Sequence, residues 1–196
     1  MRTIVFATGN NHKVEEVQGI LTASSMRLAS LADINWTDEI IEDGSNFKEN
    51  AFIKANTLYN AGHSLVLSED SGLVVEALDG LPGIFSARYA GENSTSEDNN
   101  KKILEALRNC SNRTAYFKTV VCYIEDGIPY YFQGSCPGTI LRKAEGNGGF
   151  GYDPLFKPDG YDHSFAILGS DIKSKISHRA MAFQSFDAFI TDKNLG

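Results

Sequence analysis

Two long strand-like runs separated by an Asp-Gly pair lie in the middle of this chain and constrain its fold more than any other feature. Residues 115–125 and 128–135 are rich in aromatic and β-branched side chains, and Asp126 and Gly127 stand between them. An Asp-Gly pair between two apolar runs is a strong signal for a β-hairpin, because both residues tolerate the positive φ of a two-residue turn. The chain is therefore expected to build a sheet around a long antiparallel hairpin.

The N-terminal residues add an α/β unit to that hairpin. Residues 3–8 are typical of a buried strand, Gly9 interrupts them, and apolar residues then recur with helical spacing at Val14, Val17, Ile20 and Leu21. Strands that alternate with helices in this way indicate an α/β fold.

The remaining pattern predicts three more helices and several short strands. The helices are expected at residues 46–60, from an N-cap at Ser96 to Leu107, and from Ser177 onward, the last with candidate core residues Ala180, Met181, Phe183, Phe186 and Phe189. Strands are expected at residues 65–68 and 73–77 around an acidic turn, residues 140–142 can continue the sheet, and residues 28–33 are ambiguous. No linker or repeat divides the chain, so we expect a single domain over residues 1–196.

Charge and composition limit the class of partner. The formal net charge of −7 should repel nucleic acid and anionic membranes, so an anionic ligand must be attracted by a local basic pocket or a metal ion. No apolar run approaches the roughly 18 residues of a membrane span, and the N-terminus does not resemble a secretory signal. The cysteines Cys110, Cys122 and Cys136 cannot all pair and show no CxxC spacing, which favours a reducing compartment. We expect a cytoplasmic protein.

Glu69 and Asp70 follow the apolar residues Leu65-Val66-Leu67 and are the first candidates for chemistry. If these apolar residues form a strand, the two acids lie at its carboxyl end, where α/β folds tend to bind ligands. Mg²⁺ usually takes one or two carboxylates together with phosphate oxygens. The structural alternative is a solvated turn that ends the strand.

Residues 8–13, Thr8-Gly9-Asn10-Asn11-His12-Lys13, lie between the first strand and the first helix. Backbone amides at the helix N-terminus and the Lys13 ammonium are suited to holding a phosphate. The spacing is not that of a Walker A loop, and an ordinary strand-to-helix turn with a solvated lysine is the alternative.

Residues 146–151 match the GxGxxG pattern formally but do not indicate a dinucleotide site. A Rossmann loop must open a helix, whereas Tyr152-Asp153-Pro154 follows at once. The glycines instead suggest a loop whose backbone can approach a ligand closely, with Phe150 and Tyr152 beside it and Asp153 available to hold a purine base. A surface turn with a packed phenylalanine is the alternative.

A basic cluster near the C-terminus is a second candidate for anion binding. Lys173, Lys175, His178 and Arg179 surround an expected helix start, and cations are not favoured at that end of the helix dipole. A solvated basic face is the usual explanation for such a cluster, but in an acidic chain it is one of the few places that can attract a polyphosphate.

Six segments, in order, resemble the inosine triphosphate pyrophosphatase family. They are Thr8-Gly9-Asn10 with Lys13, Phe47-x-Glu49-Asn50-Ala51 with Lys54, Asp70-Ser71-Gly72, Pro82-Gly83-x-x-Ser86-Ala87-Arg88-Tyr89, residues 148–154 and Ser177-His178-Arg179. Each motif is modestly specific, but six in order are very specific, and the bacterial branch is the most similar. Glu69 stands where bacterial members more often have Asp, and Asn46 stands where Thr is expected.

The resemblance implies a two-lobed domain with a twisted mixed sheet, flanked by helices around a central cleft, and a homodimer. It implies a Mg²⁺-dependent hydrolysis of ITP, dITP and XTP to the monophosphate and diphosphate. Asp70 would be the catalytic carboxylate and a metal ligand, with Glu42 as a further metal ligand. The implied substrate-binding residues are Thr8, Gly9, Asn10, Asn11, His12, Lys13, Lys54, Ser71, Phe150, Gly151, Tyr152, Asp153, Lys173, His178 and Arg179.

Two other functions are open at this point. A nucleotide-binding sensor without turnover would need the glycine loops and cations but not the carboxylates, and a related pyrophosphatase could act on pyrimidine triphosphates. Retention of Glu42, Glu69 and Asp70 favours hydrolysis over sensing. Residues 148–153 and the Ser-His-Arg element favour purines.

Overall fold

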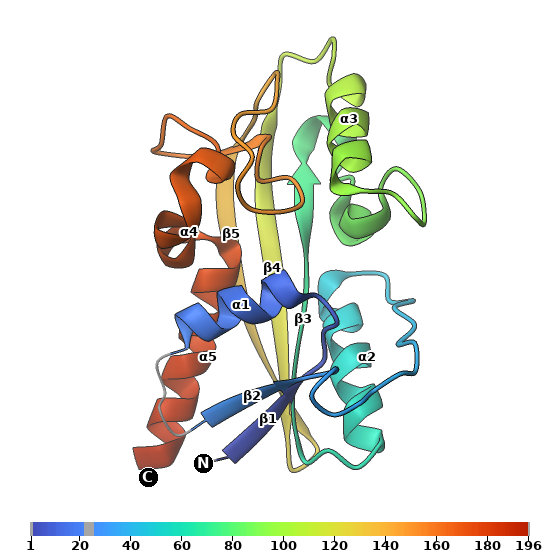
Figure 1. Ribbon diagram of the computed structural model, residues 1–196, viewed down its shortest axis with the longest axis vertical. Coiled ribbons are helices and arrows are strands. Elements are labelled where there is room, and N and C mark those ends of the chain that lie inside the picture. The colour runs from blue at the N-terminus through green and yellow to red at the C-terminus, as the bar shows by residue number, and fades with distance from the viewer. Residues whose placement is uncertain (1, 22–25, 196) are drawn as a thin grey trace. The chain divides into compact units, whose positions relative to one another are not determined.

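A computed structural model describes residues 2–21 and 26–195 of the chain (Figure 1). Its elements are, in order, β1 (Arg2–Phe6), α1 (Asn11–Ile20), β2 (Met26–Ser30), α2 (Phe47–Asn60), β3 (Leu65–Val75), the 3₁₀ helices η1 (Glu76–Leu78) and η2 (Gly83–Arg88), α3 (Ser96–Ala106), β4 (Thr114–Glu125), β5 (Ile128–Ile140), β6 (Phe156–Pro158), α4 (Phe165–Ile176) and α5 (His178–Leu195).

The strands form one mixed sheet in the order β2-β1-β3-β4-β5-β6. β1 is parallel to both β2 and β3, with Val5 opposite Val66, whereas β5 is antiparallel to β6. The predicted hairpin joins β4 to β5, and φ is 52° at Asp126 and 77° at Gly127, as a turn of two left-handed residues requires. The predicted α/β class, with a mixed sheet flanked by helices, is confirmed.

The chain divides into two compact units. The first contains residues up to Asp70, Thr119–Gly134 and the residues from Arg179 onward, and the second contains Ser71–Lys118 and Ser135–His178. β3, β4 and β5 each contribute residues to both units.

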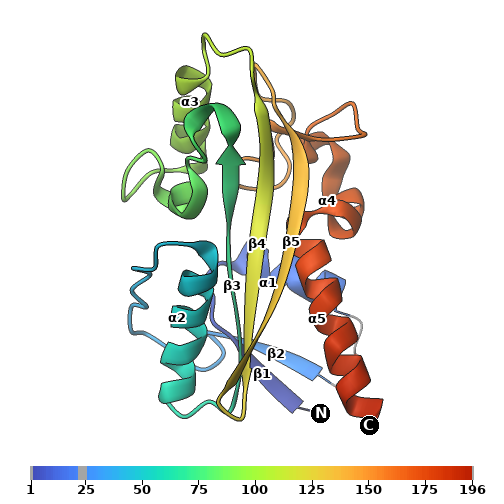
Figure 2. The ribbon, with the colours of Figure 1, turned by 180° about the vertical axis from the view of Figure 1, so that it is seen from behind.

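Strand alternation gives the first unit a core on each side of its strands. Ile4 and Phe6 face the core that contains α1 and α5, whereas Val5 and Ala7 face the core that contains α2. Figure 2 shows α2 and α5 on different sides of these strands. The residues of the first core are Ile4, Phe6, Val17, Ile20, Leu67, Val121, Tyr123, Ala180, Ala182, Phe183, Phe186 and Ile190. Because successive strand residues point to opposite faces, adjacent side chains of the central strand β3 enter different environments.

The second unit has one core, in which α3 and α4 contribute to a common apolar cluster. Its buried residues are Leu73, Val75, Ile103, Leu107, Ala115, Phe117, Cys136, Ile140, Tyr152, Leu155, Phe156 and Phe165. Phe117 lies at its centre, with its ring centroid 4.6 Å from that of Phe156 and 6.4 Å from that of Phe165.

The predicted break in the strand at the acidic pair is wrong. β3 runs without interruption from Leu65 to Val75, so Glu69 and Asp70 lie inside the strand and not in a turn at its end. Both acids are buried. Basic side chains lie against each carboxylate, so the two negative charges are neutralised within the fold and do not need the solvent that a turn would provide.

The C-terminal region also differs from its prediction. Neither α4 nor β6 was predicted. The helical pattern of α4 is hidden because a buried lysine, Lys173, occupies a core-facing position and Gly169, with φ 78°, interrupts the helix. Lys173 and Lys175 therefore lie in the last turn of α4, where cations are favoured, and α5 starts at His178, one residue after the predicted start at Ser177. Met181, predicted to be a core residue, is 41% exposed.

Helix α3 begins with a capping box one residue earlier than predicted. The Thr95 hydroxyl accepts a hydrogen bond from the Asp98 amide at 3.2 Å, and the Asp98 carboxylate accepts one from the Thr95 amide at 2.9 Å. Thr95, and not Ser96, is therefore the N-cap residue.

Removing this cap should destabilise the protein. We expect Thr95→Ala to lower the free energy of unfolding by about 1 kcal/mol, because an orphan helix amide loses its acceptor. Ser96→Ala is the matched control, and urea unfolding of both variants measures the difference. An equal loss in the two variants would contradict the cap assignment.

Candidate active site

The extended backbone of β3 sends its two adjacent acids into different surroundings. Glu69 meets Lys13 of α1 and Arg179 of α5, whereas Asp70 meets Asn50 and Lys54 of α2. Because neighbouring strand residues point to opposite faces, the two carboxylates do not share one ligand site. Of the two acids, Asp70 is the one with the predicted metal ligand Glu42 nearby.

Glu69 forms a buried ion pair with Arg179. The Arg179 Nε donates to both Glu69 carboxylate oxygens at 3.0 Å, and Nη2 lies 2.9 Å from Oε1. Lys13 Nζ lies 3.2 Å from the same Oε1, and Arg179 Nη1 donates to Glu16 at 2.5 Å. Burial opposes ionisation of Glu69, but Arg179 and Lys13 outweigh it and hold its pKa at about 2. Glu69 is therefore a permanent anion at neutral pH.

Asp70 is held in a different electrostatic state. Its Oδ2 accepts a hydrogen bond from Asn50 Nδ2 at 3.2 Å, and its Oδ1 lies 3.5 Å from Lys54 Nζ. Burial raises the pKa of Asp70 above its ordinary value, Lys54 opposes this effect, and nearby Glu42 adds to it. A carboxylate whose pKa is raised towards the working pH is suited to accept a proton.

Lys54 joins Asp70 to Glu42. The ammonium, which α2 carries into the interior, donates to the Glu42 carboxylate and lies beside Asp70. A positive charge thus already lies between these two carboxylates. Among the described residues no group of three or more acidic, histidine or cysteine side chains is arranged to hold a metal. Glu42 and Asp70 suit a hard divalent cation that completes its coordination with water and phosphate oxygens, as Mg²⁺ commonly does.

The predicted phosphate segment, residues 8–13, forms the N-terminus of α1. The Asn10 side chain caps the helix by accepting hydrogen bonds from the amides of His12 at 3.0 Å and Lys13 at 3.3 Å. Thr8 Oγ1 in turn accepts one from the Asn10 amide at 3.2 Å. Gly9, Asn10, Asn11 and His12 are exposed, so this segment presents a turn to solvent beside the partly exposed Lys13.

The second unit brings together most of the residues predicted to hold the base. We use the name base loop for residues 142–154, between β5 and β6. Asp153 Oδ2 accepts hydrogen bonds from Lys173 Nζ at 2.6 Å and from the Phe150 amide at 2.9 Å. The Lys173 ammonium lies 4.4 Å from the centroid of the Phe150 ring. Asp153 and Lys173 are both buried and paired, so they fix the loop around Phe150.

Two further contacts define this loop. Tyr152 is buried and its hydroxyl donates to the Ser86 carbonyl at 2.8 Å. A Cβ at Gly149, where φ is 73°, would lie 2.1 Å from Asp153 Oδ2, so a side chain cannot be accommodated there. Gly149 therefore allows the backbone to pack closely on the Asp153 carboxylate.

The histidine and arginine of the Ser-His-Arg element have separate surroundings. His178 belongs to the second unit, where its buried ring stacks on Phe117 with the centroids 4.7 Å apart. Arg179 belongs to the first unit and is 2% exposed. The carboxylates of Glu69 and Glu16 neutralise Arg179 in the first turn of α5, so a cation at this helix start does not require a bound anion.

Sequence reasoning missed Glu16 and the partners of Asn50 and Glu69. Asn50 orients Asp70, Glu16 shares Arg179, and Glu69 pairs with Arg179 and Lys13. Asn50 was visible as part of a motif, but its partner is 20 positions away and follows only from the packing of α2 on β3. Glu16 carried no signal, because an acid on an amphipathic helix normally lies in solvent.

Comparison with known proteins places the chain in a family. A model described as the Ham1 family matches residues 4–189, and the chain belongs to this family. Two Ham1 proteins of known structure are similar over 98% of this chain and 100% of their own: that of Coxiella burnetii has a TM-score of 0.90 at 36% identity, and that of Staphylococcus aureus a TM-score of 0.89 at 35% identity. The predicted family resemblance is confirmed.

Curated relatives are similar over nearly their whole length. The dITP/XTP pyrophosphatase of Thermoanaerobacter pseudethanolicus is 42% identical over 189 residues, which cover 95% of this chain and 96% of the relative. The dITP/XTP pyrophosphatase of Christiangramia forsetii is 43% identical over 188 residues, with 96% and 98% coverage. Within the described residues, no helix is both long and apolar enough to cross a bilayer.

Loss of the Glu69 carboxylate should show a distinct pH dependence. Since its folded pKa of about 2 lies below the ordinary 4.5, its contribution to stability is complete above about pH 4.5 and is lost as the pH falls towards 2. We expect Glu69→Gln to reduce the free energy of unfolding by about 3–5 kcal/mol at pH 7, because Arg179 loses its principal partner. The difference from the unmodified protein should shrink below pH 4.5.

Guanidinium unfolding at several pH values measures this effect, with Glu105→Gln as control. Glu105 pairs with Arg108 on the surface, where both side chains are about 70% exposed, and its loss should cost at most about 1 kcal/mol. A deficit in Glu69→Gln that is constant from pH 7 to 3 would show that ionisation of Glu69 is not its cause.

Proposed function

We propose that this chain hydrolyses deaminated purine nucleoside triphosphates (ITP, dITP and XTP) to the nucleoside monophosphate and diphosphate. The observation that carries this proposal is the buried Asp70 carboxylate, held between Asn50 and Lys54 with Glu42 beside it. The curated relatives, which bear the name dITP/XTP pyrophosphatase over nearly the same length, support the substrate class. Removal of these nucleotides from the pool is the corresponding biological role.

Hydrolysis of a phosphoanhydride depends on positioning and charge more than on covalent chemistry. In the proposed mechanism Asp70 is the catalytic residue that orients the attacking water and accepts its proton. Asn50 fixes one oxygen of the carboxylate, so the other is presented in a defined direction beside Lys54. Burial of Asp70 raises its pKa, which favours proton acceptance over permanent ionisation.

We propose Mg²⁺ as the cofactor, held by Asp70 and Glu42. When bound there, a divalent cation neutralises phosphate charge and makes water more acidic. Lys54 pairs with both carboxylates, and its flexible four-carbon stem would also allow the ammonium to contact a phosphate oxygen. Lys13 and the segment Thr8–His12 would bind the remaining phosphate oxygens, with Ser71 lining the substrate site.

The second unit is proposed to select the base. Phe150, Gly151, Tyr152 and Asp153 would hold the purine, with Lys173 and His178 beside them. The 6-oxo group of hypoxanthine or xanthine accepts hydrogen bonds, whereas adenine presents an amino donor at the same position. A site with backbone amides and Lys173 as donors satisfies the oxo group and leaves adenine facing donors, at a cost of about 1–3 kcal/mol for each unpaired group. Arg179, which pairs with Glu69 and Glu16 in the first unit, is included among the proposed substrate-binding residues on the basis of the family resemblance.

We further propose a cytoplasmic homodimer, on the basis of the family resemblance. A small nucleotide is the proposed partner, and the net charge of −7 disfavours nucleic acid.

The substrate assignment predicts a strong preference for 6-oxo purines. We expect kcat/KM for ITP, dITP and XTP to exceed that for ATP by at least about 100-fold, because sites built around hydrogen bonds to a base discriminate strongly. Diphosphate release is measured for each nucleotide with Mg²⁺ and with a chelator. Comparable hydrolysis of ATP would contradict the assignment, and faster hydrolysis of dUTP or dCTP would favour the pyrimidine alternative.

The mechanism predicts that Asp70→Asn keeps the fold and loses turnover. We expect kcat to fall by about 10²–10⁴-fold, as is typical when a positioned acid–base group is removed. Asp79→Asn is the matched control, since Asp79 is exposed and its φ of 52° is one that asparagine tolerates. Near-normal turnover in folded Asp70→Asn would remove Asp70 from the mechanism.

A further inference from the structure

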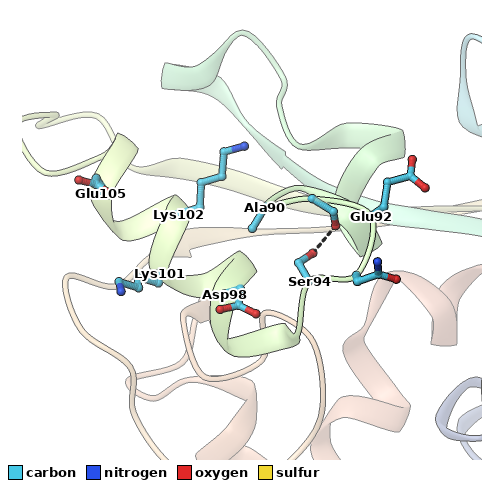
Figure 3. A pocket seen from close by; sticks show the side chains of 9 residues that line it. Ala90, Glu92, Ser94, Asp98, Lys101, Lys102 and Glu105 are labelled. Atoms are coloured by element: carbon cyan, nitrogen blue, oxygen red, sulfur yellow. Dashed lines mark hydrogen bonds between the residues drawn. The ribbon is translucent and has the colours of Figure 1, made fainter.

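Helix α3 carries two adjacent polar residues, Asn99 and Asn100, on the side that packs into the core. Asp98, Lys101, Lys102 and Glu105 recur at helical spacing on one face, and Asn100 lies on the other face with Ile103 and Leu107. The charged face borders an open hollow of about 430 Å³ whose lining mixes both signs of charge (Figure 3). The mixed charges that line this hollow do not favour one class of ligand. Asn100, in contrast, has a specific hydrogen-bond partner in the base loop.

Asn100 fastens the base loop at the residue next to Phe150. Its Nδ2 donates to the Gly151 carbonyl at 2.9 Å. Gly151 has a φ of 61°, so the peptide plane held by Asn100 is in a conformation reserved mainly for glycine. Because this plane joins Gly151 to Tyr152, fixing its carbonyl also fixes the orientation of the aromatic residues on either side.

The position of Asn100 costs stability. Its Oδ1 is buried and has no hydrogen-bond partner among the described residues. A buried acceptor without a partner is destabilising, whereas an apolar side chain of similar size at the same place is not. The unpaired Oδ1 is therefore a cost that accompanies the hydrogen bond from Nδ2 to Gly151.

Arg113 fastens the same loop at its origin. Its guanidinium donates to the carbonyls of Ile140 and Leu141 at 2.7 Å and to that of Leu107 at 2.8 Å. Ile140 and Leu141 directly precede the base loop. The Leu141 amide donates to the Leu155 carbonyl at 2.8 Å, and this hydrogen bond joins the two ends of the loop, which we call its neck. Leu107 is the C-cap residue of α3, where a carbonyl favours a cation.

Arg113 is a buried cation whose contacts are all to backbone. It is 8% exposed and forms no ion pair with a carboxylate of the described residues. Burying a charge without a counter-ion is expensive, and the three hydrogen bonds to carbonyl oxygens offset part of this cost. Three donors of fixed geometry do hold the neck of the loop and the end of α3 in one arrangement.

We propose that Asn100 and Arg113 are positioning residues for base selection, which bind the base loop to α3 and so fix the orientation of Phe150, Gly151 and Asp153. This inference rests on the proposed function, because it assigns these residues to the selectivity of that same site. α3 acts as a rigid support along the loop, through Asn100 near its first turn and through Arg113 at its last carbonyl. The selectivity for 6-oxo purines thus depends on residues that do not touch the nucleotide.

Asn100→Leu separates positioning from stability. We expect the melting temperature to be nearly unchanged, because relief of the unpaired Oδ1 offsets the loss of the hydrogen bond to Gly151. KM for XTP should rise about tenfold and kcat should stay within about threefold, because the loop loses one hydrogen bond that orients it. The ratio of kcat/KM for XTP over ATP should fall by about tenfold. Asn109→Leu, which makes the same change at an exposed position, should leave all of these values unchanged.

Arg113→Lys provides a second variant, and hydrogen exchange provides a readout that needs no substrate. We expect the amides of Phe150 and Asp153 to exchange about tenfold faster in both variants, with no change in the amides of α2. A stable Asn100→Leu protein with unaltered KM, selectivity and exchange would overturn the proposal, as would a loss in kcat that is equal for XTP and ATP. If the unmodified enzyme releases no diphosphate from XTP, the proposed function fails, and faster exchange in the loop would then still support its attachment to α3.

Discussion

The buried pair between Glu69 and Arg179 is the interaction on which the first unit depends. It joins residues 110 positions apart, so the start of α5 is fixed to the centre of the sheet. Lys13 approaches the same carboxylate, and this contact also fixes the N-terminus of α1. A buried pair of this kind does not by itself make a protein more stable than an apolar core would, but it specifies one arrangement, because each alternative leaves a charge without a partner.

This pair also shapes the chemistry of its neighbour. Arg179 and Lys13 outweigh the burial of Glu69, whereas at Asp70 burial and the nearby Glu42 outweigh Lys54, Lys13 and the amide of Asn50. Two adjacent carboxylates thereby acquire pKa values displaced in opposite directions. Such a separation is the physical basis on which one acid can be structural and the other can exchange protons. The identity of the catalytic acid therefore follows from the surroundings of both residues and not from the acidic dipeptide alone.

Local pattern was sufficient for much of the fold and for the motif residues. The β4–β5 hairpin follows from Asp126 and Gly127, and α2 follows from its apolar spacing, with Asn46 as its cap. The uninterrupted β3 could not be predicted in this way, because the cations that neutralise its acids come from α1, α2 and α5. For the same reason α4 was hidden: Lys173 looks solvated in sequence, and its burial makes sense only once Asp153 is beside it. Long-range electrostatic pairing was thus the main information that the sequence pattern lacked.

The continuity of β3 has an evolutionary consequence. Side chains on a strand alternate between faces, so the insertion or deletion of a single residue between Leu65 and Glu69 would exchange the surroundings of the two acids. The residue at the position of Asp70 would then meet the arginine, and the residue at the position of Glu69 would meet Lys54. A substitution changes one side chain of this site and leaves the others in place. An insertion or deletion shifts the register of the strand and so changes the surroundings, and with them the pKa values, of both acids at once. We expect natural variation in chain length within this family to fall in the connecting segments and to spare this strand.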